Sequence, residues 1–168
     1  MLAGTPLPIW LAGEIPVFTA KGTRIPNERP LPKSPVAMRE SQRILLVQHP
    51  NARLRSLGST YNCAGLVLAS RRTFIVDFAN VPAYLKEDGY RPLTAEEPPW
   101  PGDVVVYKSD GGSVEHLGII LEVPTGRLEA AAGPLIMSKW GHFGEYVHRL
   151  MDKPAPLGTL AEVWTERL

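Results

Sequence analysis

Residues 61–68 read Tyr61-Asn62-Cys63-Ala64-Gly65-Leu66-Val67-Leu68 and hold the one cysteine of the chain. Because the run from Ala64 to Ala69 is apolar on every side, it predicts a short, central helix that reaches to about Arg71. This helix would begin at Cys63, where unpaired backbone N–H groups and the positive end of the helix dipole favour a thiolate. Cys63 is therefore a candidate nucleophile. The alternative is a cysteine that only packs as a small apolar side chain.

Composition narrows the class of protein. The 168 residues include 18 basic and 17 acidic ones, so no strong field would attract nucleic acid or an anionic membrane. A single cysteine excludes an internal disulfide, and no Cys/His spacing is typical of a structural zinc site. The first residues lack the basic region and apolar run of a secretory signal, and no stretch is long enough to span a membrane. We expect a soluble, cytoplasmic protein.

The first 36 residues differ from the rest. They contain seven prolines, which predict extended and turn conformations and define residues 1–36 as a Pro-rich N-terminal arm. The arm also carries apolar side chains such as Trp10 and Phe18, so it should lie either against the body of the domain or against a partner protein. Residues 37–168 form the predicted single domain.

The remaining pattern predicts helices first and strands afterwards. Helices are expected near 35–48 and at 81–87, residues 53–59 form a connection of uncertain shape, and residues 90–93 are extended. Strands are expected at 103–108, 114–123 and 127–132, separated by two turns of hairpin type, and further strands at 135–140 and 144–150. This order predicts an α+β fold in which the helices pack on an antiparallel meander.

His116 is the candidate base. Strand alternation places it on one sheet face with Gly118 and Ile120, while Leu117 lies on the other face. A helix packed on the His116 face would bring Cys63 to the imidazole and form a cysteine–histidine pair. The alternative is a histidine that is merely satisfied within a half-buried strand.

Further polar residues are candidates for the same site. Glu129 is a candidate for the third group that orients the histidine, although it could simply pair with Arg127. Ser138, His142 or His148 could orient the histidine instead, or this segment could line a substrate groove with Trp140 as its platform. The alternative is a glycine-flanked turn with an aromatic core. His49 is expected at the surface end of a helix.

Four segments together resemble the NlpC-type branch of the papain-like cysteine peptidases. They are Asn62-Cys63-Ala64-Gly65-Leu66-Val67, Pro101-Gly102-Asp103-Val104-Val105-Val106, His116-Leu117-Gly118-Ile119-Ile120 and Leu128-Glu129-Ala130. The resemblance covers about residues 60–132 and has the cysteine before the histidine. Asn62 and Ala64 stand where Asp and Ser are more usual. Tyr61-Asn62-Cys63 and Ser138-Lys139-Trp140-Gly141 are similar to segments of other bacterial papain-like families.

The resemblance implies a papain-like fold and a catalytic triad of Cys63, His116 and Glu129. The implied substrate is a peptide, a peptidoglycan fragment or a protein, and no metal or organic cofactor is needed. Substrate contacts are expected from Tyr61, Asn62, Ser138, Trp140 and His142. The backbone N–H of Cys63 would supply one oxyanion donor.

Three functions stay open at this point. The leading hypothesis is a thiol hydrolase that cleaves a peptide or isopeptide bond through a thioester on Cys63, either in the cytoplasm or after delivery by a specialised secretion route. The same intermediate would serve an acyltransferase, a transglutaminase-like enzyme or a glutamine deamidase. The third is a non-catalytic interaction module that works through its N-terminal arm.

Overall fold

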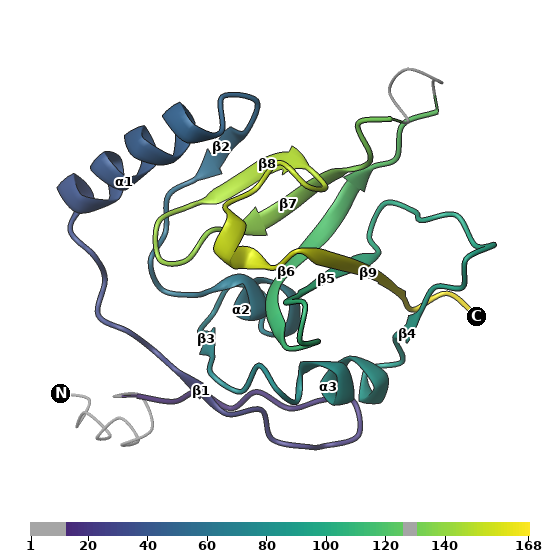
Figure 1. The fold of residues 1–168 in the computed structure, drawn as a ribbon. Coiled ribbons are helices and arrows are strands. Elements are labelled where there is room, and N and C mark those ends of the chain that lie inside the picture. Colours follow the sequence, from purple (N-terminus) through teal and green to yellow (C-terminus); the bar gives the residue numbers. More distant parts are fainter. Residues whose placement is uncertain (1–12, 126–130) are drawn as a thin grey trace, which may run out of the picture.

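The fold is built around one seven-stranded antiparallel sheet. The structure, a computed structural model, describes residues 13–125 and 131–168. The strand order is β2-β8-β7-β6-β5-β9-β4, and every neighbouring pair is antiparallel (Figure 1). The strands are β2 (Arg53–Ser56), β4 (Arg91–Pro92), β5 (Val104–Lys108), β6 (Val114–Glu122), β7 (Leu135–Lys139), β8 (Glu145–Arg149) and β9 (Leu160–Thr165).

The other elements are few and short. Two strands, β1 (Asn27–Glu28) and β3 (Phe74–Ile75), form a separate antiparallel pair. The helices are α1 (Pro35–Gln48), α2 (Cys63–Leu68), α3 (Val81–Glu87) and the short 3-10 helix η2 (Ala155–Leu157). The protein is therefore α+β, with a large antiparallel sheet and a few helices, as its sequence predicts.

The strands β5 to β8 follow one another in the sheet as the predicted meander. The sequence pattern did not predict β9, which lies between β5 and β4, and β2 lies where the pattern indicated only a connection of uncertain shape. The strand expected at 127–132 lies mostly outside the described residues, and its last two residues, Ala131 and Ala132, are in a turn. The chain thus crosses from β6 to β7 without a described strand between them.

Two of the predicted helices are confirmed. Helix α1 begins after Ser34, whose Oγ accepts a hydrogen bond from the Ala37 N–H at 3.2 Å, and α3 has its expected bounds. Helix α2 ends at Leu68, earlier than predicted, because Ser70 and Arg71 both have a positive φ, of 49° and 66°. Side chains other than glycine rarely adopt this left-handed conformation, which stops the helix.

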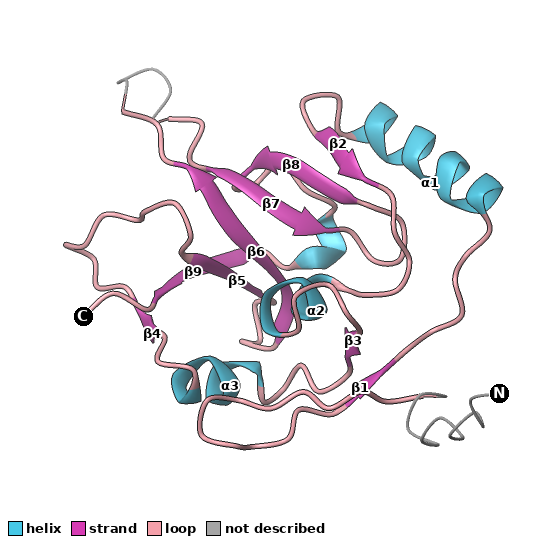
Figure 2. Cartoon of the chain, turned by 180° about the vertical axis from the view of Figure 1, so that it is seen from behind, coloured by secondary structure: helices cyan, strands magenta, loops and turns pink. Residues whose placement is uncertain are grey.

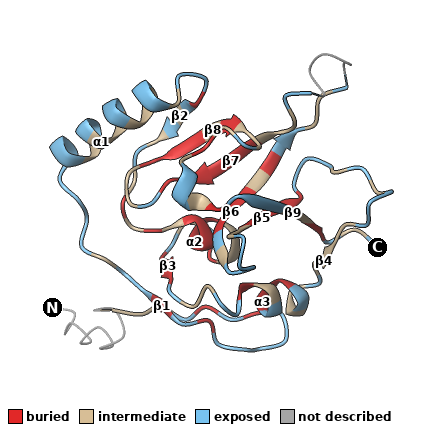
Figure 3. Cartoon of the chain, in the orientation of Figure 1, coloured by how far each residue is buried: buried red, intermediate tan, exposed pale blue. Residues whose placement is uncertain are grey.

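The larger core lies between the sheet and α2 (Figure 2). Cys63 and Ala64 of α2 pack there against Val104, Val106 and Leu117 of the sheet, so we call this side of the sheet the α2 face. Gly65 lets α2 approach the chain on its other side, since a Cβ at this position would stand 1.8 Å from the Thr73 carbonyl oxygen. The predicted helix is thus central, as Figure 3 shows by its burial.

The described part of the N-terminal arm lies on the body of the domain. Val17 and Ile25 are buried in the same core as α2. The buried side chain of Asn27 holds this loop together, because its Nδ2 donates hydrogen bonds to the carbonyls of Ile15 and Ile25 at 2.9 and 3.0 Å. Residues 13–28 therefore lie against the body of the domain, which is the first of the two alternatives considered for the arm.

The opposite face of the sheet carries a second hydrophobic core. Val105, Tyr107, Ile120 and Ile136 form a second core there, with Leu150 packed against it. Helix α1 contacts the end of this face through Leu45 and Leu46, but none of the helix residues is buried (Figure 3). Both faces of the sheet are thus covered, which decides the surroundings of every candidate residue below.

Candidate functional site

Asn62 shapes the start of α2. Its Oδ1 accepts hydrogen bonds from the N–H groups of Gly65 and Ile75, at 2.8 and 3.1 Å, and its Nδ2 donates to the Ile75 carbonyl at 2.8 Å. The side chain therefore caps the helix and ties it to β3. This uses the hydrogen-bonding groups that the sequence analysis assigned to a substrate.

Cys63 is the first residue of α2 and is almost enclosed, with 5% of its surface exposed. Burial raises the pKa of its thiol to about 11, while the backbone N–H groups of Leu117, Ala64 and Cys63 and the charge of Lys139 act in the opposite direction. The sulfur thus lies among groups that favour a thiolate, but its desolvation outweighs them and keeps the thiol protonated.

The predicted contact between Cys63 and His116 is wrong in this structure. His116 stands opposite Tyr107 in the β5–β6 ladder, and Tyr107 belongs to the core on the opposite face. The neighbouring Leu117 faces Cys63 instead. Because α2 is wholly apolar, it covers the face that offers Leu117 rather than the one that offers an imidazole. The two side chains therefore lie on opposite sides of the sheet.

His116 is held in a closed environment. It is 1% exposed, its ring centroid lies 5.6 Å from that of Tyr107, and its Nε2 has no hydrogen-bond partner among the described residues. Burial, together with the nearby His148 and Lys153, keeps its pKa well below the usual 6.5. No cleft opens beside Gly118 either, since a Cβ there would meet the Ile136 side chain at 2.4 Å. The imidazole is neutral and enclosed.

Ser138 and His148 form a second buried pair on this opposite face. The Ser138 Oγ and the His148 Nε2 are 2.7 Å apart, and the His148 Nδ1 lies 2.8 Å from the Arg149 carbonyl oxygen. A carbonyl only accepts, so the proton is assigned to Nδ1, and the serine hydroxyl donates to Nε2. Both residues are fully buried, and burial lowers the pKa of His148 to about 4. Their visible role is to satisfy each other within the core.

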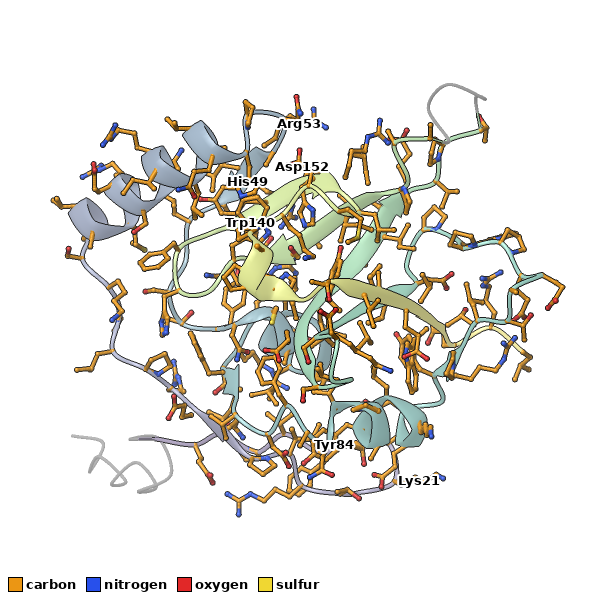
Figure 4. All side chains as sticks on the ribbon, in the orientation of Figure 1. Lys21, His49, Arg53, Tyr84, Trp140 and Asp152 are labelled. Atoms are coloured by element: carbon orange, nitrogen blue, oxygen red, sulfur yellow. The ribbon has the colours of Figure 1, made fainter. Side chains whose placement is uncertain are left out.

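Trp140 is not an exposed platform. It is 2% exposed and stacks on Tyr146 with ring centroids 4.2 Å apart, and its Nε1 donates a hydrogen bond to the Ser138 Oγ at 3.0 Å. His49 ends α1 and contacts the Trp140 ring by its edge, and its Nδ1 lies 3.2 Å from Asp152 (Figure 4). The aromatic core that the sequence analysis kept as an alternative is the observed arrangement.

His142 and Tyr61 have separate positions on the α2 side. His142 is partly exposed, and its ring packs against that of Phe74 at a tilt, with centroids 4.5 Å apart. Burial and the charges of Lys33 and Lys139 lower its pKa. Tyr61 is 7% exposed, and its hydroxyl donates a hydrogen bond to Glu145. Burial and this bond raise the pKa of Tyr61 to about 12. Glu129 lies outside the described residues.

The charged group that approaches Cys63 is Lys139, which was not among the residues predicted for the site. Lys139 and Glu145 are opposite each other in the register of the β7–β8 hairpin, and both are fully buried. Burial lowers the pKa of Lys139 to about 8, although the charges of Glu145 and Cys63 partly oppose this. The available signal was a pair of opposite charges on either side of a five-residue loop, at positions that a hairpin brings together.

Glu145 collects three donors. Besides Tyr61, the side chains of Arg55 and Arg71 contact its carboxylate at 2.6 and 2.5 Å. Burial raises the pKa of Glu145, but the hydrogen bonds from Arg71, Tyr61 and Arg55 outweigh it, so the net pKa lies below the usual 4.5. A buried carboxylate surrounded by cations thus stands next to the lysine that approaches the thiol.

No protein-family model, no curated protein and no solved structure matches the chain. Within residues 13–125 and 131–168, no group of three or more His, Cys, Asp or Glu is arranged to hold a metal ion. In the same part of the chain, none of the helices has the length and apolar character needed to cross a membrane.

Proposed function

We propose that the protein is a thiol-dependent enzyme of papain-like type that forms a thioester on Cys63 and hydrolyses an amide bond. In this proposal Lys139, not His116, is the ionisable partner of the thiol. The observation that carries it is the position of Cys63, at the start of a central helix with three backbone N–H groups and a buried lysine acting on its sulfur. These groups act to stabilise negative charge on sulfur and on a developing oxyanion, against the burial that raises the pKa of the thiol to about 11.

In the proposed mechanism, Lys139 first accepts the proton of the thiol and later donates it to the leaving group. The neutral amine of Lys139, which is more populated than in an ordinary lysine because the pKa is lowered to about 8, takes the proton of the Cys63 thiol. The thiolate then attacks the carbonyl carbon of the substrate. The resulting ammonium returns the proton to the leaving amine as the amide bond breaks. Water then cleaves the thioester. Because Cys63 is 5% exposed, the substrate reaches the sulfur only after the covering side chains move.

The test is to trap the acyl-enzyme. The protein is incubated with a panel of N-acetyl-aminoacyl thioesters between pH 6 and 9, and the mass of the intact protein reports acylation. We expect an adduct on Cys63 that the Cys63→Ala variant lacks. Lys139→Met should reduce the rate of acylation by about tenfold or more, because a positioned base contributes at least that much. His116→Leu, the matched control on the opposite face, should leave the rate unchanged.

Two results would refute the thiol enzyme. One is a folded protein that gains no adduct on Cys63, while the same cysteine reacts in urea. The other is an adduct whose rate does not depend on Lys139. The fate of a trapped acyl group also separates the alternatives, since hydrolysis releases an acid, transfer moves the group to an acceptor, and deamidation converts glutamine to glutamate.

A non-catalytic interaction module is the second candidate, and two observations favour it. The enclosed Cys63, with its raised pKa, is what a packing cysteine shows. Phe18 of the N-terminal arm is 56% exposed, which leaves an aromatic ring available to a partner. If this candidate is correct, Cys63→Ala keeps full function, and Phe18→Ser removes the interaction without changing the stability of the fold.

A further inference from the structure

A pocket of about 440 Å³ lies between the N-terminal segment and the two ends of α2. Its lining residues come from three parts of the chain: Ile15, Pro16 and Arg29 from the arm, Thr60 from just before α2, and Arg71 and Arg72 from just after it. This volume is within the usual range for small-molecule sites. Three of its six lining residues are arginines, whereas only 18 of the 168 residues of the chain are basic.

Of the three positive charges of the pocket, one is paired and two have no ion pair among the described residues. Arg71 is engaged with the buried Glu145 through its Nε at 2.5 Å. Within the described ranges, neither Arg29 nor Arg72 has a carboxylate within ion-pair distance, and the Nε of Arg72 donates only to the Ala69 carbonyl, at 3.0 Å. As far as the described residues go, two guanidinium groups beside the pocket are therefore available to a ligand.

The backbone of the turn that carries Arg71 and Arg72 is strained. Ser70 and Arg71 both have left-handed φ values, although neither is glycine. Such a conformation persists only where the surrounding contacts impose it, and here the Arg71 N–H donates to the Gly65 carbonyl at 3.0 Å while its guanidinium binds Glu145. The strained turn thus fixes one arginine in place and presents the next at the same pocket.

We propose that this pocket binds a small organic molecule through its oxyanion group, a carboxylate or a phosphate. The planar guanidinium groups of Arg29 and Arg72 match the two oxygens of such a group, and Arg71 adds to the positive field. The hydroxyl of Thr60 offers a neutral hydrogen-bonding group, and Ile15 and Pro16 offer an apolar wall for the rest of the ligand. The site stands apart from the thiol chemistry, because it requires no reaction at Cys63.

Benzoate and phenyl phosphate are suitable probes, since they share an apolar ring and differ in the oxyanion. Each is titrated against the full chain by calorimetry, and the Nε–H signals of labelled arginine report which side chains are contacted. We expect saturable binding of at least one probe below about 10 mM. Benzamide, which has the same ring and no charge, should not bind. The tighter of the two probes identifies the oxyanion that the pocket prefers.

The Arg29→Gln/Arg72→Gln double variant tests the assignment, and Arg71 is left intact because it holds Glu145. The variant should bind about tenfold more weakly or worse. Arg39→Gln/Arg53→Gln removes the same charge from exposed positions that do not line the pocket, and Figure 4 shows Arg53 near the far end of α1. This control should bind within about twofold of the original protein. Equal losses in both variants, or no saturable binding of either probe, would overturn the proposal.

Discussion

Lys139 and Glu145 stand opposite each other at the end of the β7–β8 hairpin, and both side chains are fully buried on the α2 face. Two buried charges of opposite sign attract strongly, but each also loses its hydration. Here the loss is uneven, because Glu145 receives hydrogen bonds from Arg55, Arg71 and Tyr61, whereas Lys139 donates one hydrogen bond, to the Gly141 carbonyl at 2.9 Å. Lys139 is therefore the less well compensated of the two charges, and the first two predictions follow from this difference.

Lys139→Met should stabilise the protein by about 2 kcal/mol at pH 7, since an apolar side chain replaces a poorly solvated charge and leaves the three donors of Glu145, Arg55, Tyr61 and Arg71, in place. In the original protein, Lys139 has a folded pKa of about 8, below its usual 10.5, so the unfolded chain binds the proton more tightly. The penalty therefore fades as the pH rises from about 8 to 10.5. Urea unfolding of both proteins should give a difference that shrinks over this range.

Lys21→Met is the matched control for that experiment, because Lys21 is exposed near α3 (Figure 4). It should change the free energy of unfolding by less than about 0.5 kcal/mol. A loss of stability in Lys139→Met would show that the ammonium group stabilises the fold. Such a result would contradict the burial penalty assigned to Lys139 here.

Glu145→Gln should destabilise the protein by about 3 kcal/mol at neutral pH, because it leaves the buried Lys139 and the partly exposed Arg55 and Arg71 without a negative charge beside them. The pKa of Glu145 is lowered in the folded state, so its stabilising effect is present above about pH 4.5 and is lost as the pH falls through the folded value. The difference between the two proteins in urea unfolding should thus narrow below pH 4.5. Tyr61→Phe, which removes only one of the donors, should cost about 1 kcal/mol. A pH-independent difference would mean that Glu145 acts by packing alone.

His116 should not titrate near neutrality. Burial and the neighbouring His148 and Lys153 keep its folded pKa well below 6.5, so the unfolded chain binds the proton first and stability falls as the pH drops below about 6.5. In a nuclear magnetic resonance titration, the His116 ring should remain neutral at pH 5.5, and His116→Leu should reduce the loss of stability between pH 6.5 and 5. An imidazole that titrates near its usual pKa and responds to alkylation of Cys63 would instead restore the cysteine–histidine pair.

Gly65→Ala should destabilise the protein by about 3 kcal/mol, because a Cβ would overlap the Thr73 carbonyl oxygen and push α2 away from its neighbour. Thermal unfolding measures the effect. Gly111→Ala is the control, since an added Cβ there has only one neighbour, at 3.9 Å. Similar melting temperatures for the two variants would show that α2 is not closely packed at Gly65.

Local sequence patterns predicted most of the elements. The apolar stripe after Ser34 predicted α1, and the alternating residues of β5 and β6 with a glycine turn between them predicted their hairpin. Both signals depend only on residues close together in the chain. The insertion of β9 beside β5 had no such signal, because its pairing joins residues more than fifty positions apart.

The candidate site shows the same division. Alternation correctly separated His116 from Leu117, but it could not show which of these two faces α2 would cover. The apolar character of α2 was the missed clue, since such a helix gains most by covering the face with Leu117. Arg55, Tyr61 and Arg71 come from β2, from just before α2 and from just after α2, and only folding gathers them around the Glu145 carboxylate.

The sequence by itself determined the α+β class, the central helix that starts at Cys63 and the antiparallel meander, because these depend on the period of apolar residues and on turn chemistry within short windows. The tertiary structure alone decided that Lys139 and not His116 approaches Cys63. The reason is that a strand carries side chains on both faces, and only the packing of distant segments selects which face meets the helix.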